Sequence, residues 1–195
     1  MVYKFASTSK VSFPGSGIAA LATSLNNLED IQKQVAVQTI GHDKVNQLRH
    51  VRFFGNIHGL VEHMRKHADI LRPKFEAVEE ILEKELSGTG IASWTSPKGG
   101  YFISYDTLPG CAKKVVSRCA KAGVIMTPAG ATFPGGKDPQ DTNIRIAPSF
   151  PPINDLKTAA ELLALSTKLV TVEHLLARME ASETTIESKD NKKVK

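Results

Sequence analysis

Apolar residues recur at intervals of three and four through residues 57–86, the longest stretch of helical spacing in the chain. This spacing predicts one long amphipathic helix, and Pro73 inside it predicts a kink or break near Leu71. A further helical stretch is predicted for residues 27–48, and Gly41 is the point at which it would break.

Short extended segments are predicted on both sides of these helices. Residues 2–6 have the composition of a strand, and the small apolar residues 18–24 predict a buried element, either a helix or a strand. After the long helix, residues 91–95 and 100–105 predict two strands, with Ser96–Gly99 as the turn between them.

The last third of the chain alternates between helix and strand signals. An amphipathic helix is predicted to end at Gly123, strands are predicted at 124–126 and 143–147, and a final helix is predicted to run to about Glu180. Asn154–Asp155 offers side chains that can cap this last helix. The order after the long helix is therefore β-β-α-β-β-α, and we find no internal repeat.

The pattern predicts an α/β protein with two units whose boundary lies inside the long helix. We expect residues 1–72 and residues 73–181 to belong to different domains. Residues 182–195 are expected to form a disordered basic tail, because they lack apolar periodicity. Hydrophobic residues make up 41% of the 195 positions, which is enough for a sizeable core.

Charge and cysteine content narrow the function classes. The net charge of +5 is spread along helices and concentrated in residues 189–195, without an aromatic-studded basic stripe, so we expect no nucleic-acid partner. The chain has no apolar run of transmembrane length and no signal-peptide h-region, so we expect no membrane contact and a cytoplasmic location. Cys111 and Cys119 match no zinc or redox spacing and fit reduced thiols in the core.

The segment Ser7-Thr8-Ser9-Lys10 is open to two chemical interpretations. It matches the S-x-x-K motif of penicillin-recognising serine enzymes, but the accompanying S-D-N and K-T-G motifs are missing, since Lys157-Thr158-Ala159 lacks the glycine. The alternative is a lysine that binds an aldehyde covalently, on a loop whose hydroxyls and backbone N–H groups hold a phosphate. Gly15-Ser16-Gly17 suits that loop, although exposed lysines beside serines are common.

Three segments follow Lys10 in a set order: Pro97-Lys98-Gly99-Gly100-Tyr101-Phe102, then Thr127-Pro128-Ala129-Gly130, then Asn143-Ile144-Arg145-Ile146-Ala147-Pro148-Ser149. With this order and spacing the chain resembles fold-type I pyridoxal-phosphate (PLP) aminotransferases of the class I/II superfamily, over about residues 1–180. The stretch HDKVNQLRHVRFF also resembles the branch related to MocR-type proteins. The resemblance implies the C-terminal part of a PLP-binding large domain, followed by the small domain.

The resemblance assigns roles residue by residue. Lys10 matches the lysine that carries PLP and moves the proton at the substrate Cα. Ser7 and Ser9 match hydroxyls near the cofactor phosphate, and Ser16 is a further cofactor-binding candidate. Arg145 matches the arginine that grips the substrate α-carboxylate in a bidentate pair.

Gly99 and Gly100 match a turn that passes close to the substrate, where a side chain would collide. The implied reaction moves an amino group between an amino acid and a 2-oxo acid, in a homodimer. The branch resemblance implies aspartate or glutamate as the amino acid.

The chain departs from the family in two ways. It lacks an arginine about eight residues after Lys10, and it has no counterpart of the upstream aspartate that binds the pyridine nitrogen. We therefore expect a fragment that is inactive on its own.

Other residues are weaker candidates. His63 and His67 stand four residues apart on a helix, but the HExxH zinc motif is not met and no third ligand is apparent. We expect a solvated helix face there and no metal site. Trp94 is expected to pack in the core, while Arg49 and Arg52 are expected to be surface charges, with a substrate or phosphate contact as the alternative.

Two other functions stay open. The chain would suit the effector-binding half of an aminotransferase-like transcription regulator, although no helix-turn-helix is visible. It would also suit a non-catalytic remnant. The sequence upstream of Met1 distinguishes the three: a PLP large-domain start supports the enzyme, a winged helix supports the regulator, and a genuine start supports the remnant.

Overall fold

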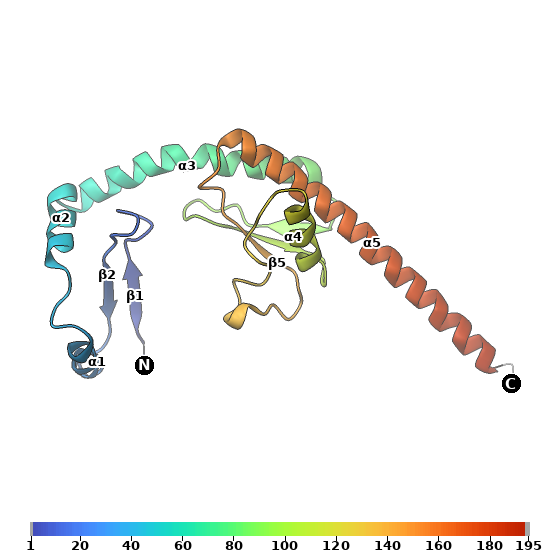
Figure 1. Ribbon diagram of the computed structural model, residues 1–195, viewed down its shortest axis with the longest axis horizontal. Helices are drawn as coiled ribbons and strands as arrows, with labels where there is room; N and C mark the ends of the chain where they lie inside the picture. The colour runs from blue at the N-terminus through green and yellow to red at the C-terminus, as the bar shows by residue number, and fades with distance from the viewer. Residues whose placement is uncertain (1, 194–195) are drawn as a thin grey trace. The chain divides into compact units, whose positions relative to one another are not determined.

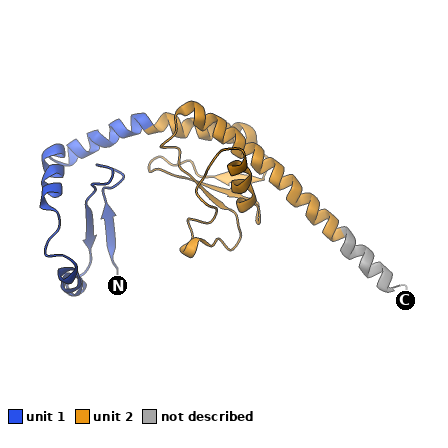
Figure 2. Cartoon of the chain, in the orientation of Figure 1, with its two compact units in different colours: residues 1–70 blue, residues 71–195 orange. Residues whose placement is uncertain are grey.

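The computed structural model describes the backbone of residues 2–193 and the side chains of residues 2–182. The chain forms two compact units, residues 1–70 and residues 71–195, which Figure 2 colours separately. The limit between them falls inside the helix α3 (Ile57–Leu86). The domain division at residues 72 and 73 stays a prediction.

The first unit contains a two-stranded antiparallel sheet, two helices and the first part of α3 (Figure 1). The strands β1 (Lys4–Ser7) and β2 (Ala19–Ala22) pair in the register that places Ser7 opposite Ala19. The segment 18–24 is therefore a strand, but most of its residues are exposed, so the predicted burial is wrong for the described residues. A two-stranded ribbon offers no second layer to cover its faces.

Two shorter helices follow, α1 (Leu25–Gln38) and α2 (Lys44–Phe54). The predicted break at Gly41 is confirmed, because this residue lies in the connection between them. Asp43 caps α2 by accepting a hydrogen bond from the backbone N–H of Asn46 at 2.9 Å. The cap fixes where α2 begins, and this matters below because α2 contacts the loop that carries Lys10.

The helix α3 runs through Pro73 without interruption, so of the kink or break predicted near Leu71 the break is wrong, while the kink stays a prediction. A proline removes only one intrahelical hydrogen bond. Burial of the residues after Pro73 offsets that loss, because they anchor the second half of α3 in the core. These anchoring residues are Phe75, Val78, Leu82 and Leu86.

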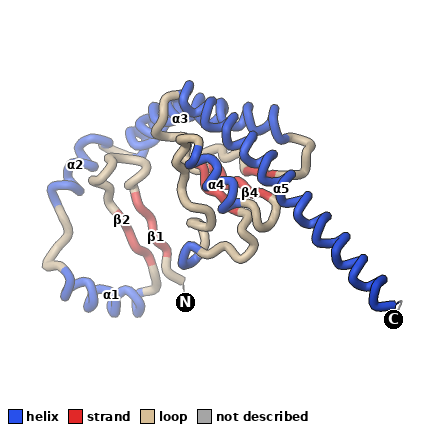
Figure 3. The backbone as a smooth tube through the Cα atoms, turned by 45° about the vertical axis from the view of Figure 1, so that its right-hand side comes forward, coloured by secondary structure: helices blue, strands red, loops and turns tan. Residues whose placement is uncertain are grey.

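The second unit is built on a three-stranded antiparallel sheet in the order β3-β4-β5. Figure 3 colours the strands red and labels β4. Its strands are β3 (Ala92–Trp94), β4 (Ile103–Thr107) and β5 (Asn143–Ile146). The helices of this unit are α4 (Ala112–Lys121), the single 3-10 turn η1 (Pro134–Gly136) and α5 (Ile153–Lys193), together with the end of α3. Within residues 2–193, no helix combines the length and the apolar character needed to cross a bilayer.

One face of this sheet forms the core together with α3, α4 and α5. Ile103 and Tyr105 of β4 and Ile144 of β5 are completely buried on that face. Trp94 stacks on Tyr105 with ring centroids 6.5 Å apart, so its predicted packing against the core is confirmed. Side chains alternate across a strand, and the residues between these core positions therefore face the other way.

Polar contacts join the helices of the second unit to one another and to the end of β5. Lys168 on α5 donates to Glu85 on α3 at 2.8 Å. The ammonium group of Lys74 on α3 donates to the backbone carbonyls of Ser149 and Pro151, at 2.8 Å each. This last contact holds the chain where it leaves β5, and it therefore supports the strand that carries Arg145.

Two expectations for the last third of the chain need correction. Residues 124–126 alternate in burial as a strand would, but among the described residues they pair with no other strand, so the order is β-β-α-β-α. The last helix begins at Ile153, which places Asn154–Asp155 in its first turn and not at its cap. The helix also extends past Glu180, its predicted end. The predicted disordered tail, residues 182–195, lies almost wholly outside the residues with described side chains.

Both cysteines are buried and free, as the sequence predicted. Cys111 precedes the first turn of α4 and Cys119 lies within that helix. Burial raises the pKa of each thiol, which favours the protonated form. The two thiols therefore act as apolar core groups.

The core position of Leu82 yields a stability prediction. We expect Leu82→Ala to lower the free energy of unfolding by about 2–5 kcal/mol, because the completely buried side chain leaves a cavity. Leu165→Ala on α5 is the matched control, since its side chain is 53% exposed, and we expect a change within about 0.5 kcal/mol. Urea unfolding followed by circular dichroism measures both, and equal losses would contradict this core.

Candidate functional site

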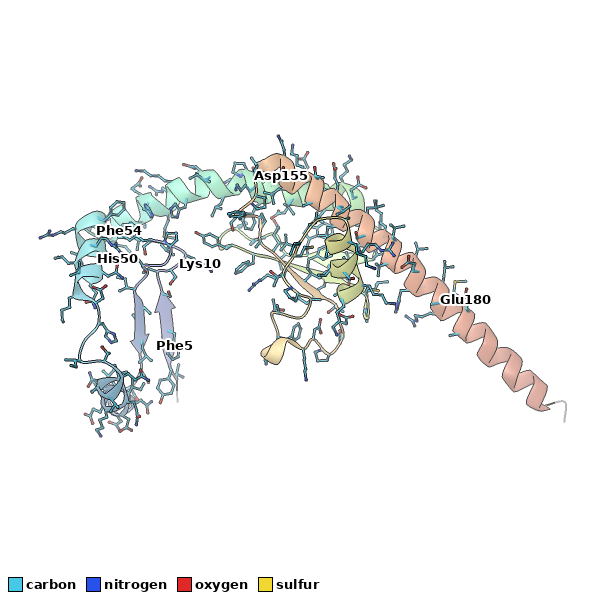
Figure 4. The ribbon with its side chains drawn as sticks, in the orientation of Figure 1. Phe5, Lys10, His50, Phe54, Asp155 and Glu180 are labelled. Atoms are coloured by element: carbon cyan, nitrogen blue, oxygen red, sulfur yellow. The ribbon has the colours of Figure 1, made fainter. Side chains whose placement is uncertain are left out.

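Lys10 lies in a single helical turn directly after β1. The backbone N–H groups of Val11 and Ser12 both donate to the carbonyl oxygen of Thr8, at 2.8 Å. Thr8 itself is held by β2, because its N–H donates to the carbonyl oxygen of Ile18 at 2.8 Å. Lys10 is exposed, and Figure 4 shows it at the loop end of the β1–β2 ribbon. The turn therefore presents the lysine to solvent from a hydrogen-bonded backbone.

Two of the three serines predicted to bind the cofactor lie together beside Lys10. The Oγ atoms of Ser7 and Ser9 are 2.7 Å apart, and both residues are exposed. Ser16 lies on the return of the same loop, where its N–H donates to the carbonyl oxygen of Phe13 at 3.0 Å. The structure thus places Ser7, Ser9, Lys10 and Ser16 on one loop of the first unit.

The return of this loop comes so close to Ser9 that only glycine fits at position 17. A Cβ atom added to Gly17 would lie 2.7 Å from both the Cα and the Oγ of Ser9. Part of that contact is backbone, so a larger residue would have to displace the loop. Gly17 therefore fixes the position of Ser9 relative to the returning chain.

The structure identifies a contact to this loop that the sequence did not predict. The Oγ of Ser12 lies 2.8 Å from Nε2 of His50 on α2, and both side chains are buried. The Nδ1 of the same ring lies 2.8 Å from the carbonyl oxygen of Asn46. A carbonyl oxygen only accepts, so Nδ1 carries a proton, and Nε2 forms the hydrogen bond with the Ser12 hydroxyl.

Asn46 makes a second contact from α2 to the loop. Its Nδ2 donates to the carbonyl oxygen of Ser16 at 2.9 Å, while its Oδ1 accepts from Arg49 at 2.6 Å. The prediction that Arg49 is only a surface charge is therefore incomplete, because its guanidinium also lies 5.2 Å above the ring of Phe13. The segment HDKVNQLRHVRFF contacts the Lys10 loop through its amide and imidazole side chains.

Phe13 anchors the same loop in a cluster of aromatic rings. Its ring centroid lies 5.0 Å from those of His50 and Phe53, and 5.8 Å from that of Phe54. His63 packs against Phe54 at 5.3 Å, so the expectation of a solvated histidine face on α3 is wrong for this residue. Within the described residues, no group of three or more histidine, cysteine, aspartate or glutamate side chains suits a metal ion.

Arg145 lies on the face of the second unit's sheet opposite the core. Its neighbours Ile144 and Ile146 point into the core, and across the strands it pairs with Ser104. The guanidinium lies 4.5 Å above the ring of Phe102, an arrangement that fixes its plane. Its Nε is buried and has no hydrogen-bond partner among the described residues. Such a group is suited to receive an anion.

The glycine turn and a small cavity lie in the same unit. Gly100 has φ of 91°, a conformation that disfavours other residues, and apart from chain neighbours no described atom lies within 4 Å of a Cβ added to Gly99 or Gly100. The need for Gly100 in this chain is therefore conformational. Arg145 also borders an apolar cavity of about 180 Å³, which residues 124–127 cover from one side.

The loop before β5 is organised by one carboxylate. The Oδ2 of Asp138 accepts hydrogen bonds from the backbone N–H groups of Thr142 at 2.7 Å and Asn143 at 2.9 Å. Asn143 in turn donates to Ser104 and Asp106 of β4, at 2.9 Å each. These bonds connect the loop to the strands on the same face of the sheet as Arg145.

The predicted residues therefore form two groups, Lys10 with its serines in the first unit and Arg145 with the glycine turn in the second. Residues 1–179, which include both groups, match the profile of the family described as aspartate amino-transferase. The chain belongs to this family.

Relatives of this chain include a protein of Mycolicibacterium smegmatis named as an aminotransferase, which is 49% identical over 172 residues. An aspartate aminotransferase of Corynebacterium glutamicum is 42% identical over 172 residues. Both alignments cover 88% of this chain and 40% of the relative, so the chain spans about 40% of the length of the curated relatives it matches.

Solved structures give the same result for the fold. An aspartate transaminase structure from Corynebacterium glutamicum matches with a TM-score of 0.84 and 42% identity, over 88% of this chain and 41% of that one. An α-aminoadipate aminotransferase from Thermus thermophilus, complexed with N-(5'-phosphopyridoxyl)-L-leucine, has a TM-score of 0.70 and 19% identity, over 87% of this chain and 42% of that one. The second likeness concerns the fold alone.

Asp138 gives this chain a pH-dependent loop. The N–H of Asn143, followed by those of Thr142 and Gln140, lowers the pKa of Asp138 to about 2 from its usual 3.8, although burial acts in the opposite direction. A carboxyl whose pKa is lower in the folded state stabilises the fold above its unfolded pKa. This contribution is complete above about pH 4 and is lost as the pH falls toward 2.

We therefore expect Asp138→Asn to lower the melting temperature at pH 7, because the amide has one uncharged oxygen in place of the two carboxylate oxygens that accept from the N–H groups of Gln140, Thr142 and Asn143. The gap between this variant and the original chain should shrink progressively between pH 4 and pH 2. Thermal unfolding at pH 7, 4 and 2.5 measures it, and a gap that stays constant to pH 2.5 would show that the carboxylate charge does not hold the loop.

Proposed function

We propose that this chain provides the cofactor lysine and the substrate-carboxylate arginine of a PLP-dependent aminotransferase. The enzyme would move an amino group between an amino acid and a 2-oxo acid. The observation that carries the proposal is the hydrogen-bonded turn that presents Lys10 beside the paired hydroxyls of Ser7 and Ser9, within a chain of the aspartate amino-transferase family.

The residues of the Lys10 loop fit the cofactor. PLP, when bound, supplies an electron sink for the bonds at the substrate Cα. The amine of Lys10, a residue exposed to solvent, would bind its aldehyde and later carry the proton at Cα. The hydroxyls of Ser7 and Ser9, with Ser16 on the returning chain, would donate to the phosphate. A relative of the same fold is complexed with a phosphopyridoxyl amino acid.

Arg145 would bind the α-carboxylate of the substrate. The ring of Phe102 packs against one side of the guanidinium. The buried Nε of Arg145 has no hydrogen-bond partner among the described residues and can donate to the carboxylate. A planar fork of donors matches the two oxygens of a carboxylate, and so fixes the orientation of Cα. The turn at Gly99 and Gly100 would leave room for the substrate beside it.

Aspartate or glutamate, with 2-oxoglutarate as the acceptor, is the substrate pair we propose. The relative from Corynebacterium glutamicum is named aspartate aminotransferase and is 42% identical to this chain. We propose a homodimer as the complete enzyme. The finer placement in the MocR-related branch stays a prediction.

The lysine assignment can be tested by chemical labelling. In a chain extended to the length of its relatives, reduction with borohydride in the presence of PLP should attach the cofactor to Lys10, because this residue is exposed on a hydrogen-bonded turn. Peptide mapping by mass spectrometry locates the label. Lys10→Ala should lose turnover entirely, and Lys98→Ala, in the glycine turn, is the control that should keep it. Label at Lys4 or Lys98 would refute the assignment.

The role of Arg145 can be tested by a substitution that keeps the charge. In the same extended chain, Arg145→Lys loses the bidentate fork, and charge-assisted hydrogen bonds are worth about 1.5–3 kcal/mol each. We expect kcat/KM for amino acids to fall by more than about tenfold. Amines that lack a carboxylate are the internal control and should be affected far less. An equal loss for both substrate types would mean that Arg145 supports the sheet and does not bind the carboxylate.

A further inference from the structure

The imidazole of His50 is a buried titratable group that the proposed reaction leaves without a task. It lies on α2, only 4% exposed, and its two ring nitrogens are both engaged. One nitrogen faces the carbonyl oxygen of Asn46 within the same helix, and the other faces Ser12, which is 3% exposed. A buried polar contact between segments 38 residues apart fixes the distance between them.

Ser12 connects His50 to the turn that carries Lys10. Its Oγ lies 2.9 Å from Oγ1 and 3.1 Å from the carbonyl oxygen of Thr8, while its backbone N–H closes the turn on that same carbonyl. Lys10 lies between Thr8 and Ser12. Any movement of the Ser12 side chain is therefore passed to the backbone on both sides of the lysine.

From this geometry we infer that His50 and Ser12 are positioning residues for Lys10. The imidazole, with its Nδ1–H donating to the carbonyl oxygen of Asn46 and its Nε2 hydrogen-bonded to the Ser12 hydroxyl, fixes the Thr8–Ser12 turn in the conformation that presents the lysine amine to the cofactor aldehyde. The inference rests on the proposed function, because it concerns the same lysine.

The first test needs no cofactor and uses the full chain of 195 residues. Hydrogen exchange of the Val11 and Ser12 amides, followed by NMR, reports the order of the turn. Loss of one buried hydrogen bond corresponds to about tenfold, so Ser12→Ala and His50→Phe should each accelerate this exchange by about tenfold or more. Ser12→Thr keeps the hydroxyl and should restore protection.

His63→Phe is the matched control, since His63 packs in the same aromatic cluster without contacting Ser12. It should leave the exchange of Val11 and Ser12 unchanged. Side-chain ¹⁵N spectra add a signature that general loosening would not produce. His50 should show a protonated Nδ1, and only the signal of Nε2, which loses its partner, should shift in Ser12→Ala.

The second test measures the consequence for Lys10. After incubation of the full chain with PLP and reduction with borohydride, the share of label on Lys10 relative to Lys98 should fall at least about fivefold in Ser12→Ala and His50→Phe. It should recover in Ser12→Thr and stay unchanged in His63→Phe.

The outcomes separate the two proposals. If the variants accelerate exchange but the original chain is labelled at Lys98 in preference to Lys10, the lysine assignment is refuted, and the positioning role with it. Preferential labelling of Lys10, with exchange unaffected by Ser12→Ala or equally affected by His63→Phe, would overturn the positioning role alone.

Discussion

The hydrogen bonds of Asn46 join the start of α2 to the loop that carries Lys10. Its N–H donates to the Asp43 cap, its Nδ2 to the carbonyl oxygen of Ser16, its Oδ1 accepts from Arg49, and its backbone carbonyl faces the imidazole of His50. Backbone groups in a loop need hydrogen-bond partners. The pairing of β1 with β2 does not reach into this loop, so the carbonyl oxygen of Ser16 accepts from a side chain of α2. The geometry around the lysine therefore depends on α2 beginning where it does.

The second unit orients its candidate residue by a different constraint, the alternation of side chains along paired strands. Ile144 and Ile146 are drawn into the core, so Arg145 between them must face away from it. A slip of one residue in the pairing of β5 with β4 would bury the guanidinium and expose both isoleucines. The Lys74 contacts to the chain after β5, and the Asp138 contacts before it, hold the strand against such a slip.

The sequence predicted the elements whose periodicity is long or whose partners are near. The long helix and the strands at 100–105 and 143–147 were found, within a few residues, because buried apolar positions repeat along them. Residues 124–126 show the limit of this reasoning. Their alternation matches a strand, but a strand also needs a free edge to pair with, and tertiary packing decides that. Pro73 failed as a breaker for the same reason, because core burial after it outweighs one lost hydrogen bond.

The candidate site divides in the same way. The sequence identified Lys10 and Arg145 by their place in ordered motifs. It did not identify His50 and Asn46, because the charge of the neighbouring arginines made those the stronger candidates. The sequence did contain a signal for this contact. Asn46, His50 and Phe54 recur at helical spacing and so share the face of α2 that meets Phe13 and the loop. Polar residues at the positions of an apolar stripe predict a buried polar contact, and such a contact is stable only when each member is satisfied. Replacing Asn46 by aspartate would therefore remove the donor to Ser16 while keeping every other bond, which makes the amide, and not only the size of the side chain, the requirement at this position.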